Sequence, residues 1–187
     1  MAHYEKMLGG KTLYDGRIIK LHLDDVELED STLAKREFVT HSGGATVVAE
    51  TDEGILFVEQ FRYPYGEVVL ELPAGKREKC EDPAITAKRE LEEETGYIAQ
   101  NLTFLGVIYP TPGYSNEKIF MYLAEGVEKR EQKLDADEFL SVRAIKAEVV
   151  AQMIASGEIK DAKTQIALLK YFCFYRGKKT ANDGKGE

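Results

Sequence analysis

The stretch "AGKREKCEDPAITAKRELEEETGY", residues 74–97, decides the fold of this chain, because it predicts a glycine loop that leads into a helix. Asp82 is a residue type that caps helix N-termini, and Pro83 is favoured at the first helical position. Gly96 is the residue type that follows a helix end, because glycine adopts the left-handed backbone conformation without strain. We therefore expect a helix that begins at Pro83 and ends just before Gly96.

Acidic residues crowd the C-terminal end of this expected helix. They are Glu90, Glu92, Glu93 and Glu94. The negative end of the helix dipole disfavours carboxylates, and Glu90 and Glu94 also repel each other as a like-charged i,i+4 pair. Each effect costs between a few tenths of a kcal/mol and about 1 kcal/mol, and all of them destabilise the helix. We therefore expect a partner that compensates the negative charge of this cluster.

A helical wheel places the cluster beside the buried face of the helix. At about 100° per residue, Ala84, Ala87 and Leu91 form one narrow apolar stripe. Three carboxylates lie along the shoulder of that stripe, those of Glu90, Glu93 and Glu94. Runs of glutamate usually face water, because glutamate is a good helix former. Carboxylate oxygens one helical turn apart can instead share divalent cations, which would cancel the repulsion.

The composition of the whole chain indicates one domain, or one domain with a small appendage. The chain has 187 residues, of which 43% are hydrophobic and 31% charged, so it can form a packed core. Its net charge of −8 argues against a nucleic-acid-binding surface. An acidic protein can still bind a phosphorylated small molecule if metal ions bridge the two sets of negative charge.

The cysteines and the apolar runs favour a soluble protein of the cytoplasm. Cys80 and Cys173 lack the spacing of a metal site or a disulfide framework, which fits a reduced compartment. The opening residues "MAHYEKMLGG" lack the apolar core of a signal peptide, and no apolar run approaches the length that spans a membrane. We expect a cytoplasmic protein that does not contact membranes.

The order of the predicted elements indicates an α/β fold. Strand patterns occupy 17–28, 34–41, 45–51, 55–61, 67–75, 102–109, 118–126 and 138–145, and helix patterns occupy 146–157 and 161–175. The first two strands predict a small N-terminal β-hairpin, and the next two predict a second hairpin. Strands on both sides of one helix, followed by two helices, predict a mixed α/β sandwich. We assign residues 1–42 to the hairpin element, 43–176 to the main domain and 177–187 to a disordered tail.

The acidic helix and the loop before it resemble the Nudix box in full. The matching residues are Gly75, Glu81, Arg89, Glu90, Leu91, Glu93, Glu94, Gly96 and Tyr97. A match of this length is far more specific than a short glycine motif. The resemblance implies a Nudix-type α/β/α sandwich with a mixed sheet. It also implies an enzyme that hydrolyses a nucleoside diphosphate linked to another group.

The same resemblance implies a site for Mg²⁺ or Mn²⁺, with two or more ions. Its ligands would be the backbone carbonyl of Ala74 and the carboxylates of Glu90, Glu94 and Glu138. The catalytic residues would be Glu138, Glu93 and Arg89. Glu93 would bind metal or hold a metal-bound water, and Arg89 would orient a carboxylate by a charge-assisted hydrogen bond. Glu138 would bind a further metal or activate the water, with Asp135 and Asp137 as competitors for that role.

Four further segments resemble the ADP-ribose pyrophosphatase branch of the family. They are "KREFVTHSGGATVV" (35–48), "EQFRYP" (59–64), "YPTPGYSNE" (109–117) and "LDADEFLSV" (134–142). The substrate contacts implied by this resemblance are Arg36, Glu37, Arg62, Thr111, Pro112, Gly113 and Glu117. The aromatic residue that stacks on adenine stays open among Tyr14, Phe38, Tyr63, Tyr65 and Tyr114.

The resemblance therefore implies hydrolysis of ADP-ribose to AMP and ribose 5-phosphate. It also implies a homodimer in which residues 1–42 contact the partner. Two alternatives remain: a nucleotide-sugar pyrophosphatase for GDP-mannose or ADP-glucose, and a Nudix-fold sensor that binds ADP-ribose without hydrolysing it. The full set of carboxylates argues against the sensor, because a protein that only binds has no need of them.

Overall fold

The computed structural model describes residues 3–132 and 139–177. The expected catalytic Glu138 and its competitors Asp135 and Asp137 lie outside the described residues. The elements are β1 (Lys6–Asp15), β2 (Ile19–Glu27), β3 (Leu33–His41), β4 (Gly44–Val48), β5 (Glu50–Thr51), β6 (Gly54–Arg62), β7 (Glu67–Glu71), β8 (Ala74–Lys76), α1 (Pro83–Thr95), β9 (Tyr97–Ile108), β10 (Ile119–Lys129), β11 (Leu140–Ile145), α2 (Ala147–Ser156) and α3 (Ala162–Phe174).

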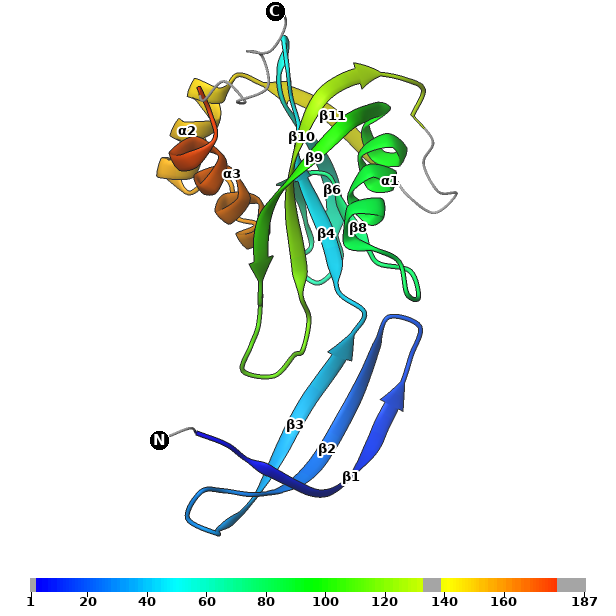
Figure 1. Ribbon diagram of the computed structural model, residues 1–187, viewed down its shortest axis with the longest axis vertical. Coiled ribbons are helices and arrows are strands. Elements are labelled where there is room, and N and C mark those ends of the chain that lie inside the picture. Colours follow the sequence, from blue (N-terminus) through cyan, green and yellow to red (C-terminus); the bar gives the residue numbers. More distant parts are fainter. Residues whose placement is uncertain (1–2, 133–138, 178–187) are drawn as a thin grey trace, which may run out of the picture.

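Two sheets form the centre of the main domain (Figure 1). One has the strand order β8-β4-β10-β9, and the other has the order β11-β6-β5 with β7 paired to β6. Strand β10 runs parallel to β4 and antiparallel to β9, so the first sheet is mixed. This arrangement confirms the mixed sheet expected from the order of the elements.

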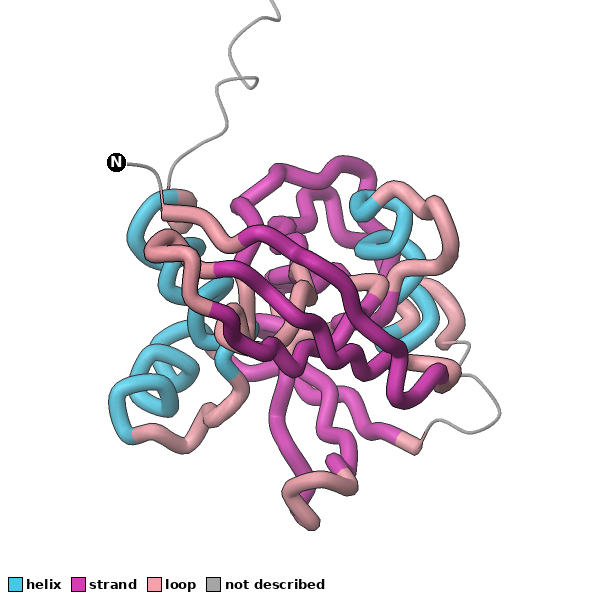
Figure 2. The backbone as a smooth tube through the Cα atoms, turned by 90° about the horizontal axis from the view of Figure 1, so that it is seen from below, coloured by secondary structure: helices cyan, strands magenta, loops and turns pink. Residues whose placement is uncertain are grey.

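Helices cover both sides of these sheets. Helix α1 lies on one side, and α2 and α3 lie on the other (Figures 1 and 2). On the α1 side, Leu91 packs in a cluster with Val47 and Leu56. On the other side, Leu168 of α3 packs in a cluster with Phe57. Neighbouring residues Leu56 and Phe57 thus point to opposite faces, as alternation along a strand requires. The α/β/α sandwich expected from the sequence is confirmed.

The second hairpin predicted from the sequence is only partly correct. The run at 45–51 does not form one strand: β4 belongs to the mixed sheet, while β5 pairs with β6 in the other. The division lies at Ala49, whose carbonyl accepts a hydrogen bond of 2.9 Å from the N–H of Leu56. Every residue of β4 is buried, so this run has no alternation to show which sheet each part joins.

The N-terminal hairpin is present but belongs to a three-stranded sheet of order β1-β2-β3. Strand β1 was missed in the sequence because its glycines and register shifts interrupt any alternating pattern. A Cβ at Gly10 would lie 2.0 Å from Oδ1 of Asp24, so a larger residue there would displace the Asp24 side chain. This sheet extends away from the main domain in Figure 1. It is tied to the β9–β10 loop, since the Val39 N–H donates to the carbonyl of Tyr114 at 2.7 Å.

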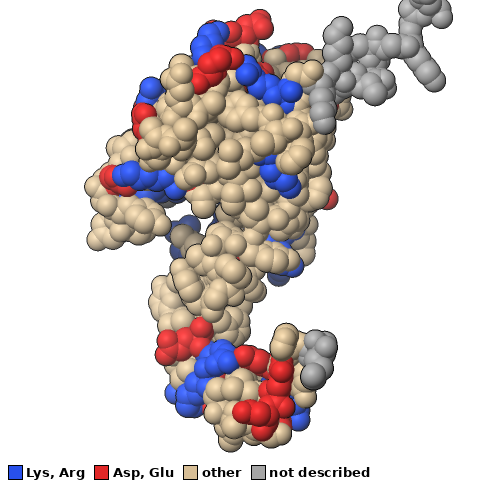
Figure 3. Space-filling view, turned by 90° about the vertical axis from the view of Figure 1, so that its left-hand side faces the viewer, with Lys and Arg blue, Asp and Glu red and all other residues tan. Residues whose placement is uncertain are grey.

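Charged side chains of both signs are interspersed on the face seen in Figure 3. No helix in the described ranges is long and apolar enough to cross a membrane. Cys80 and Cys173 are both free and exposed.

Candidate active site

Helix α1 has the ends that its sequence predicts. The Asp82 side chain accepts a hydrogen bond of 2.8 Å from the N–H of Ala84, and Pro83 is the first helical residue. Gly96 has a φ of 72°, which is the left-handed conformation of a C-cap. These two caps fix where the helix begins and ends, and hence which turn carries the glutamates.

Two buried carboxylates of α1 converge on the backbone of β8. The N–H of Ala74 donates to Oε2 of Glu94 at 2.9 Å. A Cβ at Gly75 would lie 2.0 Å from the carboxyl group of Glu90, so only glycine leaves room for this side chain. Glu90 is 7% exposed and Glu94 is 3% exposed. Both glutamates thus belong to the buried face, at the edge where the helical wheel had placed them.

Arg89 lies among three carboxylates and neutralises part of the acidic cluster. Its guanidinium donates to Glu81 at 3.0 Å, to Glu90 at 2.7 Å and to Glu93 at 2.8 Å. These bonds raise the pKa of Arg89, with the hydrogen bond to Glu81 as the largest cause. The expected contact with Glu93 is therefore present. Arg89 is thus a counter-ion within the helix itself, and it lowers the electrostatic cost of the neighbouring glutamates.

Glu81 has a larger part in this cluster than its sequence suggested. Its carboxylate accepts from Arg89, from the Thr86 hydroxyl at 2.8 Å and from the N–H of Glu78 at 2.9 Å. The hydrogen bond from Arg89 is the main cause that lowers the pKa of Glu81 to about 2. Glu81 thus anchors the loop between β8 and α1 and holds Arg89 in place.

The donor atoms around β8 suit a hard divalent cation. Two buried carboxylates and a neighbouring backbone carbonyl, that of Ala74, are oxygen ligands of the kind that Mg²⁺ and Mn²⁺ prefer. Among the described residues, no group of three or more histidine, cysteine, aspartate or glutamate side chains is arranged to hold a metal ion. Arg89 accounts for this in part, because it already engages Glu90 and Glu93.

A cavity of about 540 Å³ lies between β6, β7, the β9–β10 loop and the start of α3. Arg62 lines it and makes two hydrogen bonds to buried Glu71, of 2.6 and 2.7 Å. The pKa of Arg62 is raised first by this hydrogen bonding and further by the charges of Glu71, Glu94 and Asp161. Glu94 is the residue of α1 whose charge contributes to this effect.

Some of the predicted substrate contacts meet at this cavity and some do not. Arg62, Thr111 and Glu117 line it, together with the aromatic candidate Tyr65. Pro112 and Gly113 are exposed residues of the turn that begins at Thr111, as the N–H of Tyr114 donates to the Thr111 carbonyl at 3.2 Å.

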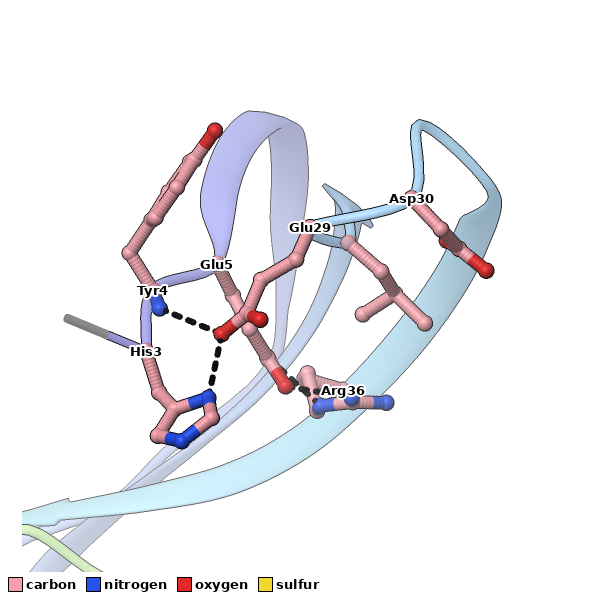
Figure 4. Close-up of a pocket in the computed structure, with 7 residues that line it drawn as sticks. His3, Tyr4, Glu5, Glu29, Asp30 and Arg36 are labelled. Atoms are coloured by element: carbon pink, nitrogen blue, oxygen red, sulfur yellow. Dashed lines mark hydrogen bonds and ion pairs between the residues drawn. The ribbon is translucent and has the colours of Figure 1, made fainter. Parts of the chain in front are cut away.

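Arg36 and Glu37 lie on β3 of the N-terminal sheet. Arg36 makes an ion pair of 2.6 Å with Glu5 in a separate hollow of about 610 Å³ (Figure 4). His3 and Glu29 make a second pair in the same hollow, at 2.8 Å. Within one chain, Arg36 and Glu37 are therefore not among the residues that line the cavity at Arg62.

Sequence reasoning missed Glu71 and Lys163, which both line the cavity. Lys163 donates to Glu71 and also pairs with Asp161 at 3.0 Å. A signal existed in each case: Glu71 lies between the apolar residues Leu70 and Leu72, and Lys163 follows two residues after Asp161, a residue type that caps helices. Neither signal identifies its partner, because 92 residues separate Lys163 from Glu71 along the chain.

The low pKa of Glu81 predicts a loss of stability in acid. A carboxyl group whose folded pKa is about 2 and whose unfolded pKa is near 4.5 stabilises the fold above pH 4.5 and loses that effect as pH falls toward 2. We expect Glu81→Gln to lower the free energy of unfolding at pH 7 by on the order of 2–3 kcal/mol, and to flatten its decline between pH 4.5 and 2. Urea titrations at several pH values measure both effects. Glu78→Gln, an exposed charge in the same loop, is the matched control, and equal effects of the two variants would refute the assignment.

Comparisons with known proteins show which family this chain belongs to. The family model described as "NUDIX domain" matches residues 40–165. The chain is 44% identical over 167 residues to "ADP-ribose pyrophosphatase" of Bacillus subtilis (strain 168), a match that covers 88% of this chain and 90% of the relative. It is 42% identical over 167 residues to "Methanol dehydrogenase activator" of Bacillus methanolicus, with the same coverage.

A solved structure shares the fold. "Crystal structure of ADP compounds hydrolase" superposes with a TM-score of 0.81 over 92% of this chain and 94% of that one, at 19% sequence identity. The acidic helix, the glycine at position 75 and the family match over most of the main domain lead to one conclusion. This chain belongs to the Nudix family.

Proposed function

We propose that this chain hydrolyses the pyrophosphate bond of ADP-ribose to give AMP and ribose 5-phosphate. The observation that carries the proposal is that Arg62 lines the cavity and is bonded to Glu71, three residues before Ala74, whose N–H binds Glu94 of α1. A pyrophosphate bound there would lie between an arginine and the carboxylates of α1. The similarity to the ADP-ribose pyrophosphatase of B. subtilis supports ADP-ribose as the substrate.

The site residues have separate parts in this proposal. The Ala74 carbonyl, Glu90, Glu94 and Glu138 would hold Mg²⁺ or Mn²⁺, in two or more ions. The metal would supply Lewis-acid chemistry, drawing charge from the phosphate oxygens and lowering the pKa of a bound water. Glu138 would accept a proton from the attacking water, as a general base.

Arg89 and Glu93 would act beside the metal ligands. Arg89 would hold the Glu90 and Glu93 carboxylates in fixed orientations, since it donates to both. Arg62 would bind the pyrophosphate through its planar guanidinium. Glu117 and Thr111 would contact the ribose end, because both line the same cavity as Arg62.

We expect ADP-ribose to be the preferred substrate. In a turnover screen with Mg²⁺, kcat/KM for ADP-ribose should exceed the values for GDP-mannose and ADP-glucose. A tenfold preference for GDP-mannose, which equals about 1.4 kcal/mol in transition-state binding, would replace this proposal with the nucleotide-sugar pyrophosphatase. Binding of ADP-ribose without any turnover would replace it with the sensor.

Metal binding should stabilise the folded protein through Glu90 and Glu94. At a metal concentration 100 times the dissociation constant, preferential binding to the native state adds about 2.7 kcal/mol, which raises Tm. Glu90→Gln combined with Glu94→Gln should abolish the rise and leave the metal-free protein at least as stable. Glu92→Gln serves as the control on the same helix turn. A double variant that is strongly destabilised without metal would show that the two carboxylates are structural instead.

The N-terminal sheet supports a homodimer. Its exposed apolar side chains include Tyr4, Met7, Leu8, Leu13, Tyr14, Ile18 and Leu33. A three-stranded sheet with this much exposed apolar surface gains stability by packing against a second copy. In such a dimer, Arg36 and Glu37 of one copy would contact the substrate in the site of the other copy.

Light scattering should therefore give the mass of two chains. Leu13→Asp combined with Leu33→Asp should shift the protein to monomer, because each aspartate would be buried without a partner in the interface. Val149→Asp, at an exposed apolar position of α2, should leave the mass unchanged. A monomeric wild type at micromolar concentration would contradict the homodimer.

A further inference from the structure

The first turn of α3 is bonded to the chain segment that leads into β8. The hydroxyl of Thr164 accepts a hydrogen bond of 2.8 Å from the N–H of Leu72, and both residues are fully buried. Asp161 caps the helix by accepting from the N–H of Thr164 at 2.9 Å. Leu72 lies two residues before Ala74, whose N–H binds Glu94. The start of α3 is thus held in a fixed position relative to the acidic helix.

Lys163 lies in this turn and contacts a buried carboxylate. Glu71 is 3% exposed, and its side chain accepts hydrogen bonds from both Lys163 and Arg62. The side chain of Lys163 is 13% exposed and also pairs with Asp161 at 3.0 Å. Salt only weakly screens charge pairs that are shielded from water, so these contacts remain strong. Each contact therefore restricts the orientation of the next side chain in the series Asp161, Lys163, Glu71 and Arg62.

This chain of contacts determines how Arg62 faces the cavity. Glu71 engages Nε and Nη2 of Arg62, which fixes the plane of the guanidinium, while 38% of the Arg62 side chain stays exposed. Lys163 holds the Glu71 carboxylate from the side of α3. The two cations and the two carboxylates, Glu71 and Asp161, balance in charge. Loss of Lys163 would free the carboxylate to rotate and would leave a net negative charge facing an anionic substrate.

We propose that Lys163 is a positioning residue for substrate binding, which acts through Glu71 to orient the Arg62 guanidinium toward a pyrophosphate group. The inference rests on the proposed function, in that Arg62 contacts the pyrophosphate. It assigns a role to the turn at residues 161–164, which the Nudix box does not include. Lys163 itself does not need to touch the substrate.

The first test is binding of ADP-ribose to the metal-free protein by calorimetry, which does not depend on turnover. Lys163→Met should weaken binding by about tenfold, and Lys163→Arg should recover most of the loss by restoring the charge. Lys146→Met is the matched control, since Lys146 is an exposed lysine that does not line the cavity and donates to the Asp52 carbonyl at 2.7 Å. It should stay within about twofold of wild type. Equal losses for the two variants would overturn the proposal in favour of a general charge effect.

The second test separates positioning from direct contact by a double-mutant cycle with Glu71. If Lys163 acts through Glu71, Glu71→Gln should weaken binding to a similar degree, and adding Lys163→Met should cause no further loss. Losses that multiply would show that Lys163 acts independently, which overturns the proposal. Should Lys163→Met fail to fold because it leaves Glu71 with one cation, Glu71→Gln alone decides: binding at wild-type strength overturns the proposal.

Steady-state kinetics with Mg²⁺ give the same answer through a different readout. Lys163→Met should raise KM by about tenfold and change kcat by less than about threefold, because it alters binding more than the reacting atoms. A wild type that shows no turnover refutes the proposed function. A wild type that binds and hydrolyses ADP-ribose, with Lys163→Met unchanged in KM and affinity, refutes the role of Lys163 alone.

Discussion

The rest of the site depends on the electrostatic repulsion among the carboxylates of α1. Glu90, Glu93 and Glu94 lie in the last two helical turns, towards the negative end of the dipole, and Glu90 and Glu94 are buried. Burial strengthens repulsion between like charges, because little water remains to screen them. The helix can form only if cations or donors stand close to each carboxylate. Arg89 supplies donors to two of them, and the N–H of Ala74 supplies one to the third.

That requirement explains several features that look unrelated in the sequence. Gly75 leaves room for the Glu90 carboxyl group against β8. Glu81 fixes Arg89 from the loop before the helix, with Thr86 as a further donor to its carboxylate. Each of these residues serves the same balance of charge. These hydrogen bonds and ion pairs stabilise the helix together, as a network, because a single exposed ion pair contributes little.

A second ion cluster, centred on buried Glu71, lies at the end of β7. Glu71 is held by Arg62 and Lys163, as the acidic residues of α1 are held by Arg89. The backbone from Glu71 to Gly75 connects the two clusters in five residues. The cluster at Glu71 exposes Arg62 to the cavity. The cluster on α1 brings the carboxylate oxygens of Glu90 and Glu94 close to β8. The cavity at Arg62 is lined by charged side chains of both signs, which suits a pyrophosphate accompanied by cations.

The sequence by itself determined the features that depend on neighbouring residues. The caps of α1 at Asp82 and Gly96, its buried stripe and the position of its glutamates all follow from local spacing. The order of elements and the box were enough to predict the sandwich and the family. Tertiary structure alone decided that β1 joins the N-terminal sheet, that the run at 45–51 divides between two sheets, and that Lys163 meets Glu71. The physical reasons differ. Strand β1 is almost wholly exposed and β4 is wholly buried, so neither shows the alternation that would assign it to a sheet. Lys163 and Glu71 are 92 residues apart, and a buried ion pair leaves no periodic pattern in either of its two segments.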